Sequence, residues 1–141
     1  MLKGDAKLSG RITRQWEEIG FQGADPATDF RGAGVLGLDQ LAQLCSRKES
    51  LSMFRESEYT KDESGKVKEG WYFFCVTGLN ITAKLITSLT KGLFDSTVLS
   101  LMEQERGGWT LAEALDHWYY MIWLAFHAKW VGEKKEMMAF N

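Results

Sequence analysis

Apolar residues recur at intervals of three and four positions along most of the chain, the spacing that places them on one face of an α-helix. Ile12, Trp16 and Ile19 share such a face and predict a first helix over residues 8–19, which Gly20 would end. A polar turn follows and contains the only proline, Pro26. A second helix of about three turns is then predicted by the apolar set Val35, Leu38, Leu41, Ala42 and Cys45.

The second half of the chain is more apolar and predicts three further helices. The first is a buried helix that ends near Gly92, and the next covers residues 95–105, before a pair of glycines. Thr110 and Glu113 form a capping-box pattern, which marks the start of the last helix. That helix is apolar nearly all round over residues 118–126, with a main stripe of Leu111, Leu115, Trp118, Ile122 and Phe126.

Alternating apolar and polar runs, the mark of half-buried strands, are scarce. We therefore expect an all-α fold, a single compact bundle of about five or six helices over residues 1–141. Residues 55–70 are charged and poor in large apolar groups, so we expect an exposed loop with short helical pieces there.

Composition narrows the classes of function. The 17 basic and 19 acidic residues give a net charge of −2, and no basic patch appears, which argues against nucleic-acid binding. The opening residues lack the apolar core of a signal peptide, and the most apolar stretches are interrupted or too short to cross a bilayer. Cys45 and Cys75 have no metal or redox spacing, so we expect a reduced, cytoplasmic protein.

Two further patterns carry little chemistry. His117 and His127 lie ten positions apart and form no ligand pattern with the cysteines, so we expect no metal site. Asn80-Ile81-Thr82 matches the N-glycosylation pattern but stands in an apolar segment, where a structural role is expected.

Gly32, Gly34 and Gly37 spell G-x-G-x-x-G, the glycine pattern of a dinucleotide-binding turn. Such a turn needs a buried strand directly before its first glycine, because it aims a helix N-terminus at the pyrophosphate. The preceding residues 24–30 are polar and turn-like, so the context excludes this cofactor. No G-x-x-x-x-G-K-[S/T] sequence is present either. We expect no bound cofactor.

Arg31 stands directly before these glycines and admits two interpretations. The glycines can keep the loop narrow, so that the planar fork of Arg31 reaches the phosphate oxygens of another molecule. Alternatively, Arg31 pairs with Asp25 or Asp29 in the same turn. The residues alone favour the local pair, because charged turn residues are usually solvated or locally paired.

Residues 16–41, WEEIGFQGADPATDFRGAGVLGLDQL, resemble the signature of the ELMO (engulfment and cell motility) domain family, above all its small ELMO-domain-containing members. The shared pattern is a tryptophan, then IGFQ, then Asp-Pro-x-Thr-Asp-Phe-Arg-Gly and a Gly-x-x-Gly-Leu helix start. VTGLNIT at residues 76–82, the helix with Trp130 and the closing MMAFN also resemble the family. The likeness runs over residues 14–141, with its signature at 14–41, and is poor at 55–70.

The resemblance implies a GTPase-activating protein for small GTPases of the Arf family, including Arf-like members, in their GTP-bound state. Arg31 matches the family's catalytic arginine and would act as an arginine finger. The GTPase would provide magnesium, the phosphate-binding loop and the water-orienting group, and would recruit the protein to membranes. Larger ELMO scaffold proteins have lost this arginine.

The resemblance also suggests how neighbouring residues contribute. Trp16, Phe21, Pro26 and Phe30 are expected to pack and hold the loop. Thr28 is expected to cap the turn through its hydroxyl. The residues expected to orient Arg31, leave room for the GTPase or meet its surface are Gln22, Asp25, Thr28, Asp29, Gly32 and Gly34.

A second function remains open, a non-catalytic ELMO-type interaction module in a trafficking or cytoskeletal complex. A small-molecule enzyme is a distant third, because no convergent acid–base set is visible in the sequence.

Overall fold

The computed structural model of the protein describes residues 7–30, 32–93, 96, 100, 103 and 108–136. Two short 3-10 helices come first, η1 (Arg14–Ile19) and η2 (Pro26–Thr28). Four α-helices follow, α1 (Gly34–Ser46), α2 (Lys48–Ser57), α3 (Phe74–Thr90) and α5 (Leu111–Gly132). Extended pairing in these residues is limited to one isolated bridge between Lys61 and Val67. The expected all-α fold is confirmed.

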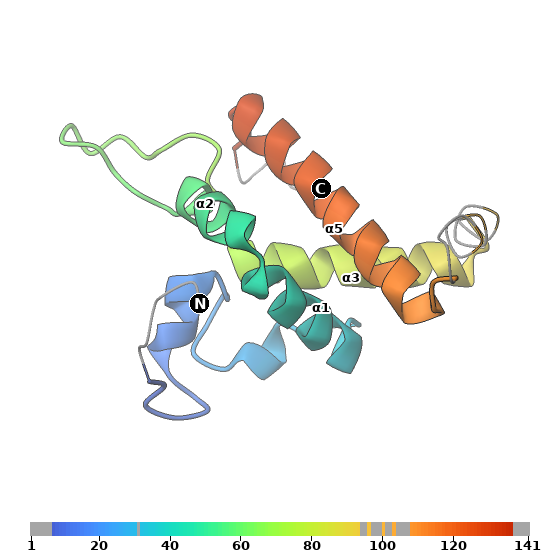
Figure 1. Cartoon of the computed structure of the whole chain (residues 1–141). Coiled ribbons are helices and arrows are strands. Elements are labelled where there is room, and N and C mark those ends of the chain that lie inside the picture. Colours follow the sequence, from blue (N-terminus) through green and yellow to red (C-terminus); the bar gives the residue numbers. More distant parts are fainter. Residues whose placement is uncertain are drawn as a thin grey trace.

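Helix α3 runs through the middle of the molecule, with α1 packed along it and α5 crossing it (Figure 1). Helix α2 contacts both α1 and α5. The N-terminal segment with η1 lies beside the start of α3 (Figure 1). One apolar cluster joins these elements, and its largest fully buried members are Trp123, Phe74, Leu44 and Leu79.

Glycines set the distance between the helices of this core. A Cβ on Gly37 of α1 would stand 2.6 Å from the Ala33 Cβ and 3.0 Å from the Leu79 Cδ2. A Cβ on Gly78 of α3 would stand 2.9 Å from the Leu41 Cδ1. Real Cβ atoms do not approach this closely, so α1 and α3 pack together only because both positions lack a side chain.

A buried polar seam links three helices across the core. The Thr82 hydroxyl on α3 donates to the Gln40 Oε1 on α1 at 2.8 Å. The Gln40 amide in turn donates to the Asp116 carboxylate on α5 at 3.3 Å. Gln40 and Thr82 are almost fully buried, so each needs this partner. The role of Thr82 in the Asn-x-Thr match is therefore structural.

The predicted helices behind residue 34 correspond to α1, α3 and α5, and the capping box is present. The Glu113 N–H donates to the Thr110 hydroxyl, and the Thr110 N–H donates to the Glu113 carboxylate at 2.8 Å. The predicted stripe of α5 is rotated from the buried one, since Leu111 is 53% exposed. The fully buried face is formed by Ala114, Tyr119, Trp123, His127 and Trp130.

The helix predicted over residues 8–19 is wrong in its first half. A 3-10 helix begins only at Arg14, and Leu8 and Ile12 are exposed. Thr13 is extended, and its hydroxyl accepts from the Gln15 backbone N–H. The Ser9 hydroxyl donates to the Thr13 hydroxyl, and the Ser9 N–H donates to the Gln15 side chain. These local side-chain bonds compete with helical hydrogen bonds. Trp16, Ile19 and the stop at Gly20 agree with the prediction.

The exposed loop predicted over residues 55–70 is shorter than expected, because residues 55–57 belong to α2. Helix α2 itself is not predicted by the apolar pattern. The helix predicted over residues 95–105 lies largely outside the described residues. Within this range the structure describes residues 96, 100 and 103, and these are helical. None of the described helices combines the length and apolar character that crossing a bilayer requires.

Candidate functional site

The loop that carries Arg31 runs from Phe21 to Gly34 and is anchored at its start. Gly20 ends η1 with φ = 90°, and its carbonyl accepts from the Val76 N–H at the start of α3 at 3.0 Å. A Cβ on Gly20 would lie 2.4 Å from the Phe74 nitrogen, so only glycine permits this approach. Phe21 is buried, and its ring packs edge-on against Trp16.

Asp29 holds the middle of the loop together. Its side chain is 4% exposed, and its carboxylate accepts from the Gln22 N–H at 2.8 Å. The Asp29 N–H donates to the Pro26 carbonyl. The buried carboxylate thus closes residues 22–29 into a loop on the core side, where it can orient the segment that follows.

Asp25 organises the outer turn of the same loop. Its carboxylate caps η2 through the Ala27 N–H and pairs with Arg11 at 3.0 Å. The Thr28 hydroxyl donates to the Asp25 carbonyl at 2.8 Å, which agrees with the local turn role expected for Thr28. Arg11 is a contributor that the sequence analysis missed, and fourteen positions separate it from Asp25.

Arg31 itself lies outside the described residues, and the structure describes the residues on either side of it. Phe30 before it is half-buried against the core, and Ala33 after it is buried. A Cβ on Gly32 or Gly34 would meet nothing within 4 Å, and Gly34 has φ = 54°. The chain is therefore held on both sides of Arg31, with open space beside the glycines.

The glycines of the G-x-G-x-x-G pattern thus have different structural roles. Gly34 adopts a left-handed conformation that favours glycine, and Gly37 permits helix packing. The turn that precedes them is the 3-10 helix η2, in place of the strand that a dinucleotide site needs.

Helix α1 extends from the loop and presents apolar side chains to solvent. Val35 is 84% exposed and Leu38 is 50% exposed. The sequence analysis placed both in one apolar set with Leu41, Ala42 and Cys45, but the buried positions of α1 are Gly37, Gln40, Leu41 and Leu44. Two exposed apolar side chains therefore lie within one turn of the open glycines.

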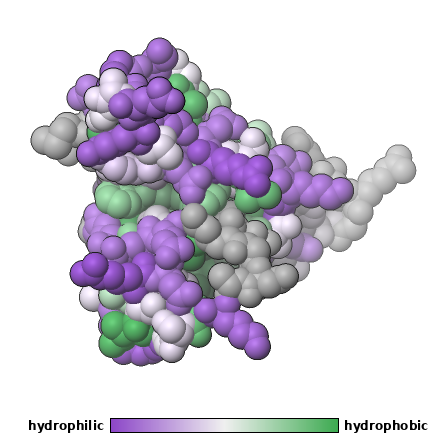
Figure 2. Space-filling model, turned by 90° about the vertical axis from the view of Figure 1, so that its left-hand side faces the viewer, coloured by the Kyte–Doolittle hydropathy of each residue, from purple (hydrophilic) through white to green (hydrophobic). Residues whose placement is uncertain are grey.

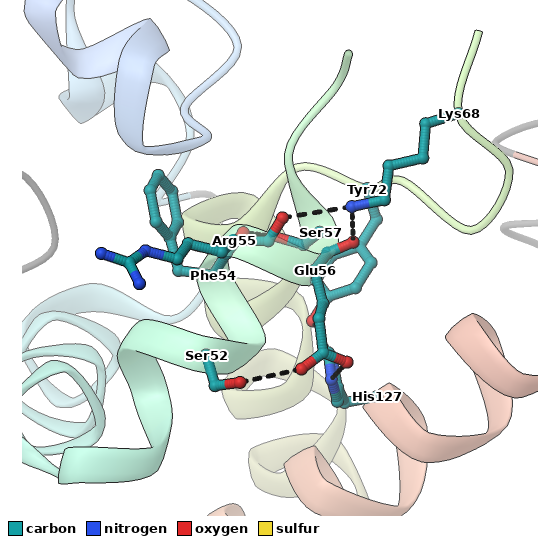
Figure 3. A network of polar contacts seen from close by, with 8 residues as sticks. All are labelled: Ser52, Phe54, Arg55, Glu56, Ser57, Lys68, Tyr72 and His127. Atoms are coloured by element: carbon teal, nitrogen blue, oxygen red, sulfur yellow. Dashed lines mark hydrogen bonds and ion pairs between the residues drawn. The ribbon is translucent and has the colours of Figure 1, made fainter. Parts of the chain in front are cut away.

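The second histidine of the sequence analysis, His127, belongs to a buried network between α2 and α5 (Figure 3). The Tyr72 hydroxyl lies 2.7 Å from Nδ1 of His127, and Nε2 lies 3.3 Å from the Glu56 carboxylate. Burial raises the pKa of Tyr72, so its phenol keeps its proton. The Glu56 carboxylate can only accept, so in the neutral imidazole the hydrogen lies on Nε2 and Nδ1 accepts from the Tyr72 hydroxyl. Nε2–H then donates to Glu56, which also accepts from Ser52.

Lys68 adds two bonds from its ammonium, to the carbonyls of Arg55 and Glu56, and so ties the loop to the end of α2 (Figure 3). The arrangement joins α2, the start of α3 and α5, which is a structural role.

The cysteines and the remaining acidic groups suggest no reactive centre. Cys45 and Cys75 are free thiols, and burial raises the pKa of each. No three His, Cys, Asp or Glu side chains in the described part of the chain come together as a metal site.

Comparison with known proteins gives one consistent group of relatives. The chain is 33% identical over 138 residues to ELMO domain-containing protein B of Dictyostelium discoideum, covering 97% of this chain and 44% of that protein. It is 32% identical over 162 residues to human ELMO domain-containing protein 1, covering 99% and 47%. It is 34% identical over 142 residues to mouse ELMO domain-containing protein 2, covering 100% and 45%.

The chain thus spans a little under half the length of these relatives. No solved structure gives a significant match. The profile of the ELMO/CED-12 family matches residues 1–141, and the chain belongs to that family.

Proposed function

We propose that this protein is a GTPase-activating protein for small GTPases of the Arf family, including Arf-like members, and that Arg31 is its arginine finger. The observation that carries the proposal is the setting of Arg31 in the family's signature. It stands between a buried anchor at Asp29 and open space at Gly32 and Gly34. A single ELMO-like domain over residues 1–141 would provide this setting.

The chemistry fits an arginine supplied from outside the nucleotide site. GTP hydrolysis spreads negative charge over the phosphoryl and leaving-group oxygens, and an inserted guanidinium accelerates it by about 10³–10⁵. Within the described residues, the Asp25 carboxylate pairs with Arg11 and accepts from the Ala27 N–H, and the Asp29 carboxylate accepts from the Gln22 N–H. Both carboxylates thus hold the loop on which the proposed finger stands.

The surface around the loop suits a protein partner. Gln22 and Thr28 are exposed beside it. Val35 and Leu38 offer apolar area that docking would remove from water, at roughly 25 cal/mol per Å². We assign these residues, with Asp25, Gly32 and Gly34, to the GTPase-facing surface. The protein would act in the cytoplasm and reach membranes through its GTPase.

The decisive experiment is single-turnover GTP hydrolysis by a panel of Arf and Arf-like GTPases with wild-type protein and Arg31→Lys. Lysine keeps the charge but loses the planar fork, so acceleration should disappear while the protein stays folded. Arg55→Lys is the matched control, because Arg55 is exposed on α2 and points away from the network in Figure 3. No acceleration by wild-type protein across the panel would sink the proposal.

A second candidate is a non-catalytic interaction module, which the exposed Val35 and Leu38 also favour. In that case the protein binds its partner without accelerating hydrolysis. Pull-down of GTP-loaded and GDP-loaded GTPases by wild-type and Arg31→Lys protein separates the two functions. Binding that is equal for both proteins, with no acceleration by either, would identify the module.

A further inference from the structure

A groove lies between η1 and the chain that joins α2 to α3. Its hollow has a volume of about 90 Å³, and its rim includes Glu17, Glu18, Glu58, Tyr59, Trp71 and Phe73. Figure 2 shows the face that carries the loop over residues 58–70 above and the N-terminal segment below. A band of paler, more hydrophobic atoms separates these two hydrophilic parts (Figure 2).

Aromatic rings form one wall of this groove and meet at near right angles. The Tyr59 and Trp71 ring centroids are 4.9 Å apart with an interplanar angle of 83°. Trp71 and Phe73 follow at 5.5 Å and 83°. Tyr59 is 51% exposed. In an edge-to-face pair the edge of one ring covers a face of the other, so the exposed Tyr59 ring offers the accessible π surface, and π faces attract cations.

Among the described residues, the charged side chains that line the hollow are acidic, namely Glu17, Glu18 and Glu58. Glu58 has a further interaction of its own, so the charge argument rests on Glu17 and Glu18. Glu17 and Glu18 are exposed on η1, and neither forms an ion pair with a residue of the described chain. Lys68 of the 58–70 loop directs its ammonium to the carbonyls of Arg55 and Glu56 on α2.

Backbone bonds fix the walls of the groove before any ligand arrives. The Val76 N–H donates to the Gly20 carbonyl at 3.0 Å and ties η1 to α3. The Tyr72 N–H donates to the Ser57 carbonyl at 3.0 Å and ties the aromatic wall to α2. A preformed site loses less entropy on binding than one that must be assembled.

We propose that this groove binds a lysine or arginine side chain that an extended segment of a partner protein presents. The alkyl stem of such a side chain packs against aromatic rings, and its charged end lies over a π face near the carboxylates. The complementarity of charge selects a basic segment over an acidic or purely apolar one. This binding is independent of GTP hydrolysis and of Arg31.

The test is an NMR titration of the whole ¹⁵N-labelled chain with four blocked five-residue peptides. Each peptide has Gly-Ser on one side and Ser-Gly on the other, around a central lysine, norleucine, arginine or citrulline. The lysine and arginine peptides should shift the Gly20 amide and the Trp71 indole signals saturably, with roughly millimolar affinity. Their uncharged counterparts should not. Equal shifts with norleucine, or no shift at these two signals, would overturn the proposal.

Charge and ring variants sharpen the test. The double variant Glu17→Gln, Glu18→Gln should lower the affinity for the lysine peptide by about tenfold at low salt. Added salt should abolish that difference. Tyr59→Leu should lower the affinity further while keeping the fold. Glu49→Gln with Glu63→Gln is the matched control, since both residues are exposed and outside the groove. An equal loss in both glutamate pairs would show a general charge effect and reject the site.

Discussion

The carboxylate of Asp29 accepts from the backbone N–H of Gln22 at 2.8 Å, in a partly buried hydrogen bond that spans the segment preceding Arg31. Asp29→Ala leaves that N–H without its acceptor, which costs about 1–3 kcal/mol of unfolding free energy. It should also reduce GTPase activation with Arg31 still present, because the loop is no longer held. Asp29→Asn keeps an acceptor oxygen and should lose less of both. Urea unfolding and single-turnover hydrolysis measure the two effects, and unchanged values for Asp29→Ala would contradict this role.

The exposed apolar pair on α1, Val35 and Leu38, should contribute to the affinity for the GTPase and not to the rate of GTP hydrolysis within the complex. The double variant Val35→Gln, Leu38→Gln removes apolar contact area. Glutamine is a good helix former, so α1 and the loop before it should stay intact. Half-maximal acceleration should then require about tenfold more protein, with the rate at saturation unchanged. Leu111→Gln with Met121→Gln, two exposed positions on α5, is the control. An equal loss in both pairs would place the effect outside the α1 surface.

The glycines differ in how they tolerate a methyl group. Gly37→Ala places a Cβ 2.6 Å from the Ala33 Cβ at the start of α1 and 3.0 Å from the Leu79 Cδ2 on α3, so we expect a loss of about 1–3 kcal/mol of unfolding free energy. Gly32→Ala meets open space and should leave the unfolding free energy nearly unchanged. Thermal and urea unfolding of both variants check this contrast, and equal stability of the two would show that the α1–α3 contact adapts freely.

The Tyr72–His127 bond should contribute measurably to stability. Tyr72→Phe keeps the ring in the core but removes the donor to Nδ1 of His127, a loss of about 1–2 kcal/mol. Tyr59→Phe, at an exposed hydroxyl, should cost almost nothing. Urea unfolding at neutral pH compares them. A Tyr72→Phe protein as stable as wild type would mean that water or another donor replaces the phenol.

Thiol reactivity reports the burial of the two cysteines. Burial raises the pKa of Cys45 to about 11, so about one part in three thousand is thiolate at pH 7.5. A disulfide reagent such as DTNB should react slowly with the folded protein at pH 7.5 and quickly in urea. The folded state holds this proton more tightly than the unfolded state does. Its stabilising contribution is therefore complete below the unfolded pKa and is lost as the pH rises towards 11. Fast reaction at pH 7.5 without urea would contradict the burial.

The sequence predicted best where a local signal dictates the backbone. The capping box at Thr110, the stop at Gly20 and the start of α1 all follow from short-range hydrogen bonding or φ preference. The setting of Arg31 was predicted in part, since Thr28 takes its expected turn role. The pair between Arg11 and Asp25 could not be predicted, because fourteen positions separate the two charges.

Helix faces were harder to predict than helix positions. Helix α1 carries apolar residues on both sides, so its periodicity fits either face, and tertiary packing through Gly37 selects the one with Leu41 and Leu44. Helix α2 was missed because it buries serines: Ser50 donates to the Leu44 carbonyl and Ser57 to the Phe54 carbonyl. A serine satisfied by backbone behaves as a small core residue, and a hydropathy pattern scores it as polar.

The anchoring of the Arg31 loop at both ends has a consequence for the speed of encounter. Gly20 is bonded to the start of α3, and Ala33 is packed where α1 meets α3. The described residues of the loop therefore lose conformational freedom during folding, before any partner arrives. A partner that docks on it meets a preformed surface, so diffusion and orientation, and not loop ordering, set the association rate constant.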